Sequence, residues 1–274
     1  MKIYVLGSKG MLGRYVTKYL SQQNEVVEIN RDVLDASQQT EQSLGLILTS
    51  VGVKEGDVII NCMGTIKPRV DQLGDLNAIL VNSVFPRLLA NVCEKNNWNM
   101  IHPTTDCVYS GHKGSYSEDD KYDVNDVYGM SKAMGEPNNC TVVRTSIIGE
   151  EIGQTRSLVE WVKSNANKEV FGFTNHLWNG VTCLQFAKIC ETIISTNNYW
   201  KGIKHLHSNT LNKKELVETI SEVYGLNITV NEKETPVSCD RSLSTTEKEN
   251  LIVFNIPSLK DQIIEMKNFS SKLL

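Results

Sequence analysis

A tyrosine and a lysine four residues apart are the side chains of this sequence best suited to moving a proton. Tyr128 and Lys132 belong to the segment YGMSK, and their spacing places both on one face of a helix. Taken alone, such a pair is more often a surface pair. The upstream segment HPTTDCVYSG strengthens the functional interpretation, because its hydroxyl groups follow a predicted strand. Reactive side chains gather at the carboxyl ends of strands in parallel sheets.

Three glycines near the N-terminus have the spacing of a phosphate-binding turn. Gly7, Gly10 and Gly13 come directly after an apolar run and before a helical pattern of apolar residues. Without a Cβ, these positions let the backbone turn tightly, approach a pyrophosphate and pack the helix on the sheet. The amides of the first helical turn then face the phosphates. A tight turn without a ligand is the plain alternative. The predicted dinucleotide site includes the three glycines, Lys9, Met11 and Leu12.

The tip of the second predicted strand bears on the choice between NADH and NADPH. The strand ends at Ile29, Asn30 and Arg31, with no acid to hold the adenosine ribose hydroxyls. The guanidinium of Arg31 can fork onto a 2′-phosphate, so the sequence favours NADPH. Asp32 is adjacent and keeps NADH open. The plain alternative for Arg31 is an exposed surface charge.

Apolar runs and helical patterns alternate along the chain. Strands are predicted at 2–7, 25–29, 57–62, 99–102 and 141–145, and helices at 11–20, 38–50 and 78–93. Pro86 must kink the last of these helices or lie near its start. Further helices are predicted at 154–165, 181–196 and 212–224, and short strands at 202–207 and 227–232. Such alternation is typical of a parallel sheet covered by helices on both faces.

These elements predict an α/β protein with a Rossmann-type doubly wound parallel sheet and a smaller C-terminal α/β cap that binds substrate. The dinucleotide-binding domain is expected to comprise residues 1–148 and about 181–200. The cap is expected to comprise residues 149–180 and 201–274. Ligands of such sheets bind beyond the carboxyl ends of the strands.

Together, GSKGMLG, INCMG, TTDCVYSGHKGSYSEDD, YGMSKAMGE and VVRTSIIG resemble the extended short-chain dehydrogenase/reductase superfamily. Within it, the chain looks most like the dTDP-4-dehydrorhamnose reductase branch, whose relatives reduce UDP-linked 4-keto-6-deoxy or 2-acetamido-2,6-dideoxy sugars. The resemblance implies NADPH-dependent reduction of the C4 ketone of a UDP- or dTDP-linked 4-keto-6-deoxyhexose. The implied setting is the biosynthesis of a rhamnose-like or N-acetylated rhamnosamine-like deoxysugar for a polysaccharide.

The resemblance also implies a role for each matching residue. Tyr128 would donate a proton to the oxygen that becomes a hydroxyl, and Lys132 would stabilise the phenolate and hydrogen-bond the nicotinamide ribose. A cation is needed because a free tyrosine has a pKa of about 10. Thr105 would hydrogen-bond the substrate oxygen, with Thr104 as the fallback if the register shifts by one. A further segment would line the cofactor, although its two central residues have core packing as a plain alternative: Asn61, Cys62, Met63 and Gly64.

Cys107 follows Thr105 and Asp106 at a position where the related 4,6-dehydratases carry a glutamate, so dehydration by their route is not expected. GDP-fucose synthase, a similar enzyme, carries a cysteine here that moves a proton during epimerisation. The resemblance therefore offers Cys107 as an acid and base at C3 or C5, with His176 as its partner. The plain alternative is a buried, inert thiol.

Two other functions fit the same motifs. A regulatory subunit of methionine adenosyltransferase resembles this branch, binds NADP and keeps the tyrosine and lysine without catalysis. A sugar-nucleotide epimerase that retains NAD would consume no added NADPH. A reductase should differ in having a polar substrate cleft, formed by residues 144–180 and the C-terminal third of the chain. Besides Thr105, its candidate lining residues are Asp106, Arg144, Asn175, His176 and Trp178.

Composition argues against several classes of partner. The chain has 274 residues, a net charge of −4 and no basic tract, so binding to nucleic acid or to an anionic membrane is not expected. Its seven cysteines form no CxxC pair and indicate reduced thiols in the cytoplasm. No apolar run approaches the roughly 20 residues of a membrane span. No metal site is indicated, because His205 and His207 lack acidic or thiol neighbours. The expected partner is a nucleotide sugar, with a homodimer as an option.

Overall fold

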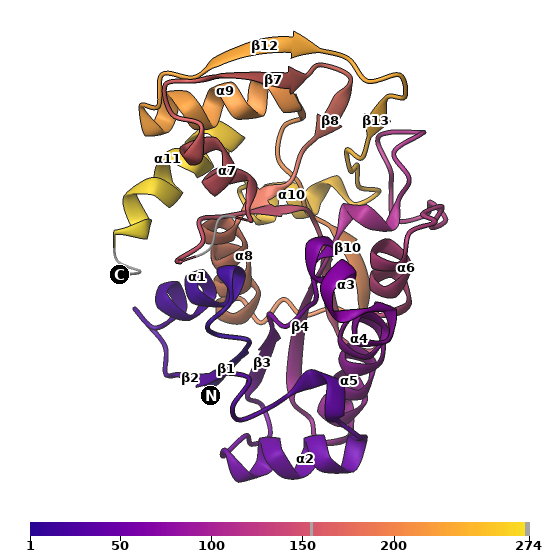
Figure 1. Ribbon diagram of the computed structural model, residues 1–274. Helices are drawn as coiled ribbons and strands as arrows, with labels where there is room; N and C mark the ends of the chain where they lie inside the picture. The colour runs from indigo at the N-terminus through magenta and orange to yellow at the C-terminus, as the bar shows by residue number, and fades with distance from the viewer. Residues whose placement is uncertain (154–155, 272–274) are drawn as a thin grey trace.

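A six-stranded parallel sheet forms the centre of the computed structural model, which describes residues 1–153 and 156–271 (Figure 1). The strand order is β10-β5-β4-β3-β1-β2, so β1 lies between β2 and β3 and the chain reverses its direction across the sheet there. Ligand crevices of α/β sheets form at such a reversal. The strands are β1 (Ile3–Leu6), β2 (Val26–Ile29), β3 (Val58–Asn61), β4 (Asn99–Thr104), β5 (Thr141–Arg144) and β10 (Gly202–His205).

Helices cover both faces of this sheet, which explains why its central strands are apolar throughout. On one face, α1 (Met11–Leu20) and α8 (Cys183–Ser195) pack on alternate strand residues such as Ile3 and Ile60. On the other, α2 (Glu41–Ser50) and α5 (Phe85–Lys95) pack on the residues between them, such as Tyr4 and Ile59. The predicted doubly wound architecture is confirmed.

The predicted helix around Pro86 is part of a longer helical run with an irregular centre. It comprises α4 (Asp75–Ile79), a π-helical turn over Leu80–Val84, and α5, with Pro86 in the first turn of α5. The 21 residues of Asp75–Lys95 are long and apolar enough to cross a membrane by length and composition, contrary to the expectation from the sequence. Half of the most apolar window is buried inside the protein, as in a helix that covers a sheet.

A smaller α/β unit, the cap, is formed after residue 148 and lies above the sheet in Figure 1. In it, β7 (Glu169–Phe173) pairs with β12 (Thr229–Lys233), and β8 (His176–Trp178) lies between β11 (Leu211–Asn212) and β13 (Cys239–Asp240). The strands β6 (Ile147–Ile148) and β9 (Val181–Thr182) pair with each other and belong to none of the other sheets. The cap helices are α7 (Leu158–Ser164), α9 (Lys213–Tyr224), α10 (Lys248–Val253) and α11 (Leu259–Ser270).

Two predicted boundaries differ from the structure. Residues from 201 onward were all predicted to belong to the cap, but β10 pairs with β5 and extends the central sheet. This pairing joins residues about 60 positions apart (202 and 141), which a local pattern cannot reveal. The helix predicted at 154–165 begins at Leu158 behind the N-cap Ser157, and residues 154–155 of that prediction lie outside the described residues. By contrast, α9 has Asn212 as its N-cap and ends at Gly225, its C-cap, as expected.

Arg144, predicted to line the substrate cleft, is instead buried at the end of β5 with 1% of its surface exposed. Its Nε and Nη2 donate to the two carboxylate oxygens of Glu136 at 3.0 and 2.5 Å, and Nη1 donates to the Tyr109 hydroxyl at 2.7 Å. The predicted role was wrong because the side chain turns into the interior, where every donor that it uses meets a protein acceptor. Because these donors are bound inside the protein, the Arg144 guanidinium is not available to a ligand.

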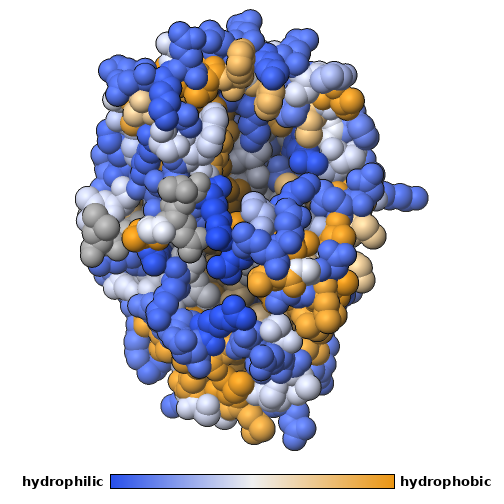
Figure 2. Space-filling view, in the orientation of Figure 1, coloured by the Kyte–Doolittle hydropathy of each residue, from blue (hydrophilic) through white to orange (hydrophobic). Residues whose placement is uncertain are grey.

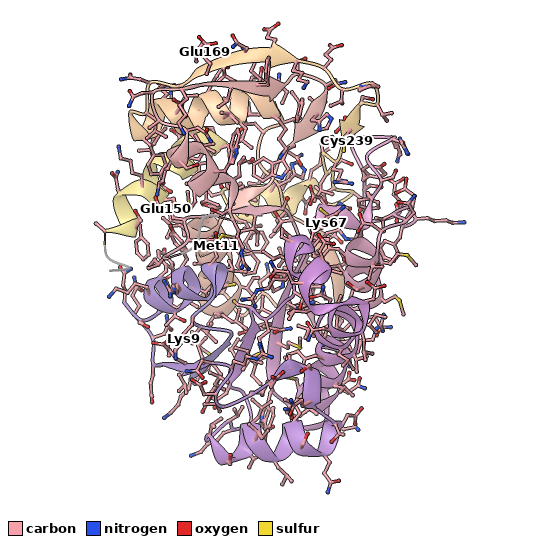
Figure 3. All side chains as sticks on the ribbon, viewed as in Figure 1. Lys9, Met11, Lys67, Glu150, Glu169 and Cys239 are labelled. Carbon is pink, nitrogen blue, oxygen red and sulfur yellow. The ribbon has the colours of Figure 1, made fainter. Side chains whose placement is uncertain are left out.

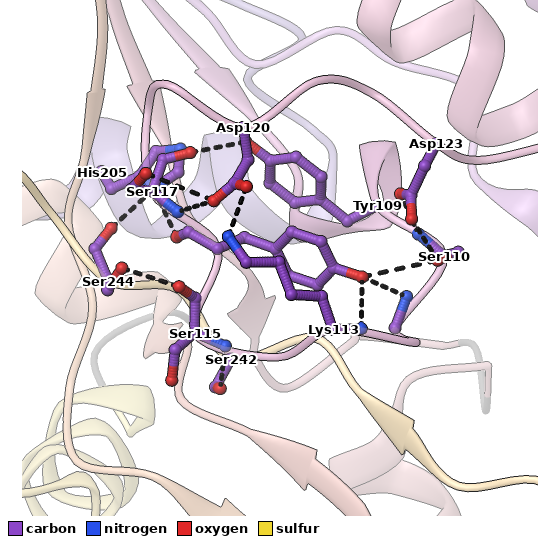
Figure 4. Close-up of polar contacts among 12 residues, drawn as sticks. Tyr109, Ser110, Lys113, Ser115, Ser117, Asp120, Asp123, His205, Ser242 and Ser244 are labelled. Atoms are coloured by element: carbon purple, nitrogen blue, oxygen red, sulfur yellow. Dashed lines mark hydrogen bonds and ion pairs between the residues drawn. The ribbon is translucent and has the colours of Figure 1, made fainter.

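His205 at the end of β10 completes this buried network. Its Nε2 lies 2.7 Å from Nη1 of Arg144, and because a guanidinium only donates, Nε2 must accept and the ring is neutral. The proton on Nδ1 then reaches the Ser244 carbonyl oxygen at 2.7 Å. Burial lowers the pKa of His205 to about 4, which agrees with this tautomer. Figure 4 shows His205, Ser244 and Tyr109 among the polar contacts that join the loop after β4 to the C-terminal segment.

Replacing Arg144 by methionine should lower the free energy of unfolding by about 3–5 kcal/mol, because the Glu136 carboxylate would be left buried without its cation. Denaturant unfolding followed by circular dichroism measures this loss. The matched control is Lys188→Met, which removes an ion pair of 2.6 Å between half-exposed side chains and should cost less than about 1 kcal/mol. Equal, small losses for the two variants would contradict this account of the network.

Candidate active site

The glycine loop after β1 leaves the amino end of α1 open to a ligand. Gly7 has φ +77°, a conformation that side chains rarely adopt, and a Cβ on Gly13 would lie 2.1 Å from the Gly7 carbonyl oxygen. Both glycines are therefore required by the turn and by the packing of α1 against it. Gly10 is the N-cap of α1 and offers no side chain to its first amides. These amides can bind a pyrophosphate, so the loop fits a dinucleotide.

A cavity of about 350 Å³ opens between this loop and the ends of β2 and β3. Seven of the residues predicted to bind a cofactor line it, namely Gly7, Lys9, Gly10, Arg31, Cys62, Met63 and Gly64. Met11 and Leu12 pack into the protein core instead, and Figure 3 shows Met11 at the start of α1. Asn61 is buried and supports the turn after β3, since its Oδ1 accepts from the Met63 amide at 3.2 Å. Figure 2 shows that this face of the molecule is hollowed near its centre.

Arg31 lies in this cavity, but its guanidinium is already engaged. Nε and Nη2 donate to Oδ2 of Asp35 at 3.0 and 2.9 Å. Lys9 is placed in a similar way, with its ammonium 3.6 Å from a carboxylate oxygen of Asp32. The two cations that the sequence analysis assigned to the cofactor are thus both paired with acids on the β2 side of the cavity.

Tyr128 and Lys132 lie on α6 (Val127–Met134), which packs tightly on the short 3-10 helix Asp106–Val108 after β4. A Cβ on Gly129 would lie 2.3 Å from the Cys107 carbonyl oxygen, so glycine at this position allows the contact. Thr105 is the N-cap of the 3-10 helix, and its Oγ1 accepts from the Cys107 amide at 3.1 Å. Burial raises the pKa of Tyr128 above its ordinary value, and the Thr105 hydroxyl acts in the opposite direction. The structure therefore brings Thr105 and Tyr128 together.

Lys132 reaches across to the loop after β3. Its Nζ lies 2.9 Å from the point where a Cβ on Gly64 would be, so this lysine borders the cavity next to a residue that lines it. Burial lowers the pKa of Lys132 to about 8, whereas the Glu136 carboxylate acts to raise it. Burial also keeps the pKa of Tyr128 above its ordinary value. The phenol therefore stays protonated near neutral pH, which is the state that a proton donor needs.

Asn82, which the sequence analysis missed, ties these segments together from the π-helical turn. Its amide group exchanges two hydrogen bonds with the Thr65 backbone, at 2.8 and 2.9 Å, and donates to the Ser131 hydroxyl at 3.1 Å. Irregular π turns within helices are frequent at functional sites. The one signal in the sequence was Pro86, which indicated a disturbance of the helix but not a polar side chain four positions earlier.

The predicted substrate residues are only partly brought together. Asp106 is buried and accepts from the Thr105 hydroxyl at 3.1 Å. Asn175 and His176 both bind Thr235, at 2.8 Å for Nδ2 to the carbonyl oxygen and 2.7 Å for Nε2 to Oγ1. The prediction for Trp178 was wrong, because it is 4% exposed and packs inside the cap.

Two cations of the cap that the sequence analysis did not select face Asp106 and Cys107 instead. Lys213 lies 5.1 Å from the Trp178 ring, and burial lowers its pKa while the Asp106 carboxylate acts to raise it. Arg241 donates from Nε to the Tyr109 carbonyl oxygen at 2.9 Å, and its charge also acts on Cys107. No motif marks these residues. They lie near each other because β11 and β13 both flank β8, and Lys213 and Arg241 directly follow these two strands.

Cys107 does not have the environment of a proton-transfer thiol. Burial and, to a smaller extent, the neighbouring Asp106 carboxylate raise its pKa to about 12. His176, its predicted partner, is bound to Thr235 and packs on the Phe173 ring. No hydrogen bond joins Cys107 to His176 among the described residues. Within residues 1–153 and 156–271, no cluster of three or more histidine, cysteine or carboxylate side chains could hold a metal ion.

Three relatives carry names from nucleotide-sugar and glycan biosynthesis. A dTDP-4-keto-6-deoxy-D-glucose reductase of Streptomyces niveus is 31% identical over 52% of this chain and 51% of its own length, so the match spans about half of that relative. A dTDP-4-dehydrorhamnose reductase of Aggregatibacter actinomycetemcomitans is 29% identical over 74% and 72%. A probable low-salt glycan biosynthesis reductase of Haloferax volcanii is 25% identical over 97% of both chains.

Solved structures share the fold at low sequence identity. A dTDP-4-dehydrorhamnose reductase of Bacillus anthracis, crystallised with NADP, superposes with a TM-score of 0.82 over 97% of this chain and 98% of that one, at 17% identity. The ortholog from Clostridium acetobutylicum has a TM-score of 0.80 at 19% identity over 99% and 100%. The family model described as the RmlD substrate binding domain matches residues 1–212. The chain therefore belongs to the RmlD family.

Proposed function

We propose that this protein uses NADPH to reduce the C4 ketone of a nucleotide-linked 4-keto-6-deoxyhexose. The observation that carries the proposal is that the glycine loop opens on a cavity bordered by the Lys132 ammonium beside Gly64, while Tyr128, on the same helix as Lys132, meets the Thr105 hydroxyl. The names of the relatives support a reductase of nucleotide sugars. The proposal includes sugars linked to either dTDP or UDP.

Each residue would contribute a separate part of the reaction. NADPH, when bound, supplies the hydride that the ketone carbon receives. Tyr128 starts protonated and delivers its proton to the ketone oxygen, which Thr105 holds in place by a hydrogen bond. Lys132 stabilises the phenolate that remains, and Asn82 keeps the loop at Thr65 and the helix at Ser131 in register. Lys213 and Arg241 offer positive charge from the cap to an anionic substrate.

NADPH is proposed over NADH because three cations against two acids give the cavity a net positive charge, to which the open end of α1 adds. Epimerisation through Cys107 is not part of the proposal. Because its pKa is raised to about 12, the Cys107 thiol stays protonated near neutral pH. The cytoplasm as the site of action and a homodimer as the assembly remain predictions from the sequence.

Turnover is tested by mixing the protein and NADPH with a panel of dTDP- and UDP-linked 4-keto-6-deoxy sugars and following the absorbance of NADPH. Wild type should oxidise NADPH with at least one of them, and Tyr128→Phe should lower kcat by about 10²–10⁴-fold, since the proton donor is lost. Tyr199→Phe is the matched control, because its hydroxyl has no hydrogen-bond partner among the described residues and Tyr199 lies at the opposite end of the sheet, before β10.

Other outcomes would select among the alternatives. A protein that binds NADPH but oxidises it with no sugar would be a binding subunit of the kind that resembles the regulatory subunit of methionine adenosyltransferase. Interconversion of sugar isomers without net consumption of NADPH would identify an epimerase that retains its cofactor. Equal rates for wild type and Tyr128→Phe would remove the phenol from the mechanism.

Deuterium incorporation tests the role of the Cys107 thiol. During turnover in heavy water, we expect no deuterium at C3 or C5 of the product with either wild type or Cys107→Ser, because the thiol stays protonated and His176 is engaged elsewhere. Mass spectrometry and proton NMR of the product give the answer. Deuterium that appears with wild type and disappears with Cys107→Ser would show that Cys107 supports epimerisation after all.

A further inference from the structure

The cavity behind the glycine loop is lined by three cations, of which two already have acidic partners. Arg31 is fixed to Asp35 by two hydrogen bonds, and Lys9 lies 3.6 Å from Asp32. The third cation is Arg69 of α3 (Lys67–Leu73), on the opposite side of the chain reversal from β2. Its side chain forms no hydrogen bond or ion pair with any residue that the structure describes.

The pairing of Arg31 with Asp35 is held in place from a second direction. Oδ1 of Asp35 accepts from the Ser37 amide at 2.9 Å and from the Ser37 hydroxyl at 2.7 Å, which makes Asp35 the N-cap of the 3-10 helix Ala36–Gln38. The Ser37 hydroxyl is the largest cause of a lowered pKa for Asp35, and Arg31 adds to it. The carboxylate therefore stays ionised and anchored at neutral pH.

A phosphate that approached Arg31 would compete with this carboxylate. The guanidinium presents its Nε and Nη2 edge to Asp35, the edge best shaped for a bidentate contact. A 2′-phosphate placed there would also be repelled by the fixed negative charge. Arg69 carries neither disadvantage, because its fork is unoccupied and no acid is paired with it.

We propose that Arg69, rather than Arg31, is the main residue that recognises the 2′-phosphate of NADPH, and that Asp35 weakens this preference so that NADH is also bound. The proposal rests on the proposed function only in that the cavity binds a nicotinamide dinucleotide. Arg69 on α3 would then determine cofactor specificity, although it is far in sequence from the tip of β2, where such residues are usually found. The net charge of the five groups, three cations and two acids, is +1.

Direct binding separates this assignment from catalysis. The dissociation constants of NADPH and NADH are measured by isothermal titration calorimetry, with adenosine 2′,5′-bisphosphate and AMP as probes of the phosphate alone. Arg69→Ala should weaken NADPH and the bisphosphate by about 10- to 100-fold, the effect of a lost charged hydrogen-bond pair. NADH and AMP should change by less than about threefold.

Two further variants test the role of the acid. Asp35→Asn keeps an N-cap side chain for the 3-10 helix and should tighten NADPH about three- to tenfold, with little effect on NADH. Arg31→Ala should weaken NADPH by less than Arg69→Ala does. The control is Arg87→Ala on α5, an exposed arginine outside the cavity whose side chain contacts the Met134 carbonyl oxygen. Thermal unfolding confirms that each variant is folded.

Distinct results would overturn the assignment. An equal loss for NADPH and NADH in Arg69→Ala would place Arg69 on the adenine or ribose instead of the phosphate. A loss carried wholly by Arg31→Ala would make Arg31 the phosphate ligand. If wild type binds neither dinucleotide, the proposed function fails together with this assignment. If wild type binds NADPH and NADH equally well, only the assignment of Arg69 is refuted.

Discussion

The buried ion pair between Arg144 and Glu136 holds together the elements that carry the candidate site. Arg144 ends β5, and Glu136 follows α6, the helix of Tyr128 and Lys132. The same guanidinium donates to the hydroxyl of Tyr109, the residue directly after the 3-10 helix Asp106–Val108. Movement of any one of these elements would leave a charge buried without its partner, which proteins avoid at high cost. The site is thereby kept in a defined geometry before any ligand arrives, as efficient proton transfer requires.

The cations near the candidate site have the opposite sign to the net charge of the chain. The chain carries −4, yet the proposed ligands are anionic. Positive charge is concentrated at two places: Arg69 and the amino end of α1 at the cofactor cavity, and Lys213 with Arg241 of the cap near Asp106. At physiological ionic strength, exposed charges are screened beyond about 8 Å. Recognition must therefore come from these nearby groups.

The sequence alone was sufficient to predict the features that depend on residues close to one another in the chain. The glycine loop was readable because Gly7 and Gly13 contact each other within one turn. The four-residue spacing of Tyr128 and Lys132 indicated one helical face, and α6 confirms the helix. Alternating apolar runs predicted the doubly wound sheet, since strands buried on both faces have no polar side. Even the ends of α9 followed from a capping residue and a glycine.

Only the tertiary structure decided which side chains share a cavity and which charges are free. Arg144 and Trp178 belonged to suitable segments, but the direction of a side chain at the end of a strand depends on partners distant in sequence. The same reason hid Asn82, whose partners stand 17 and 49 residues away. For Arg31 the sequence determined the position and the charge. Its engagement by Asp35, and the freedom of Arg69, depend on how the chain folds around the cavity, because pairing energies depend on distances that only the folded chain establishes.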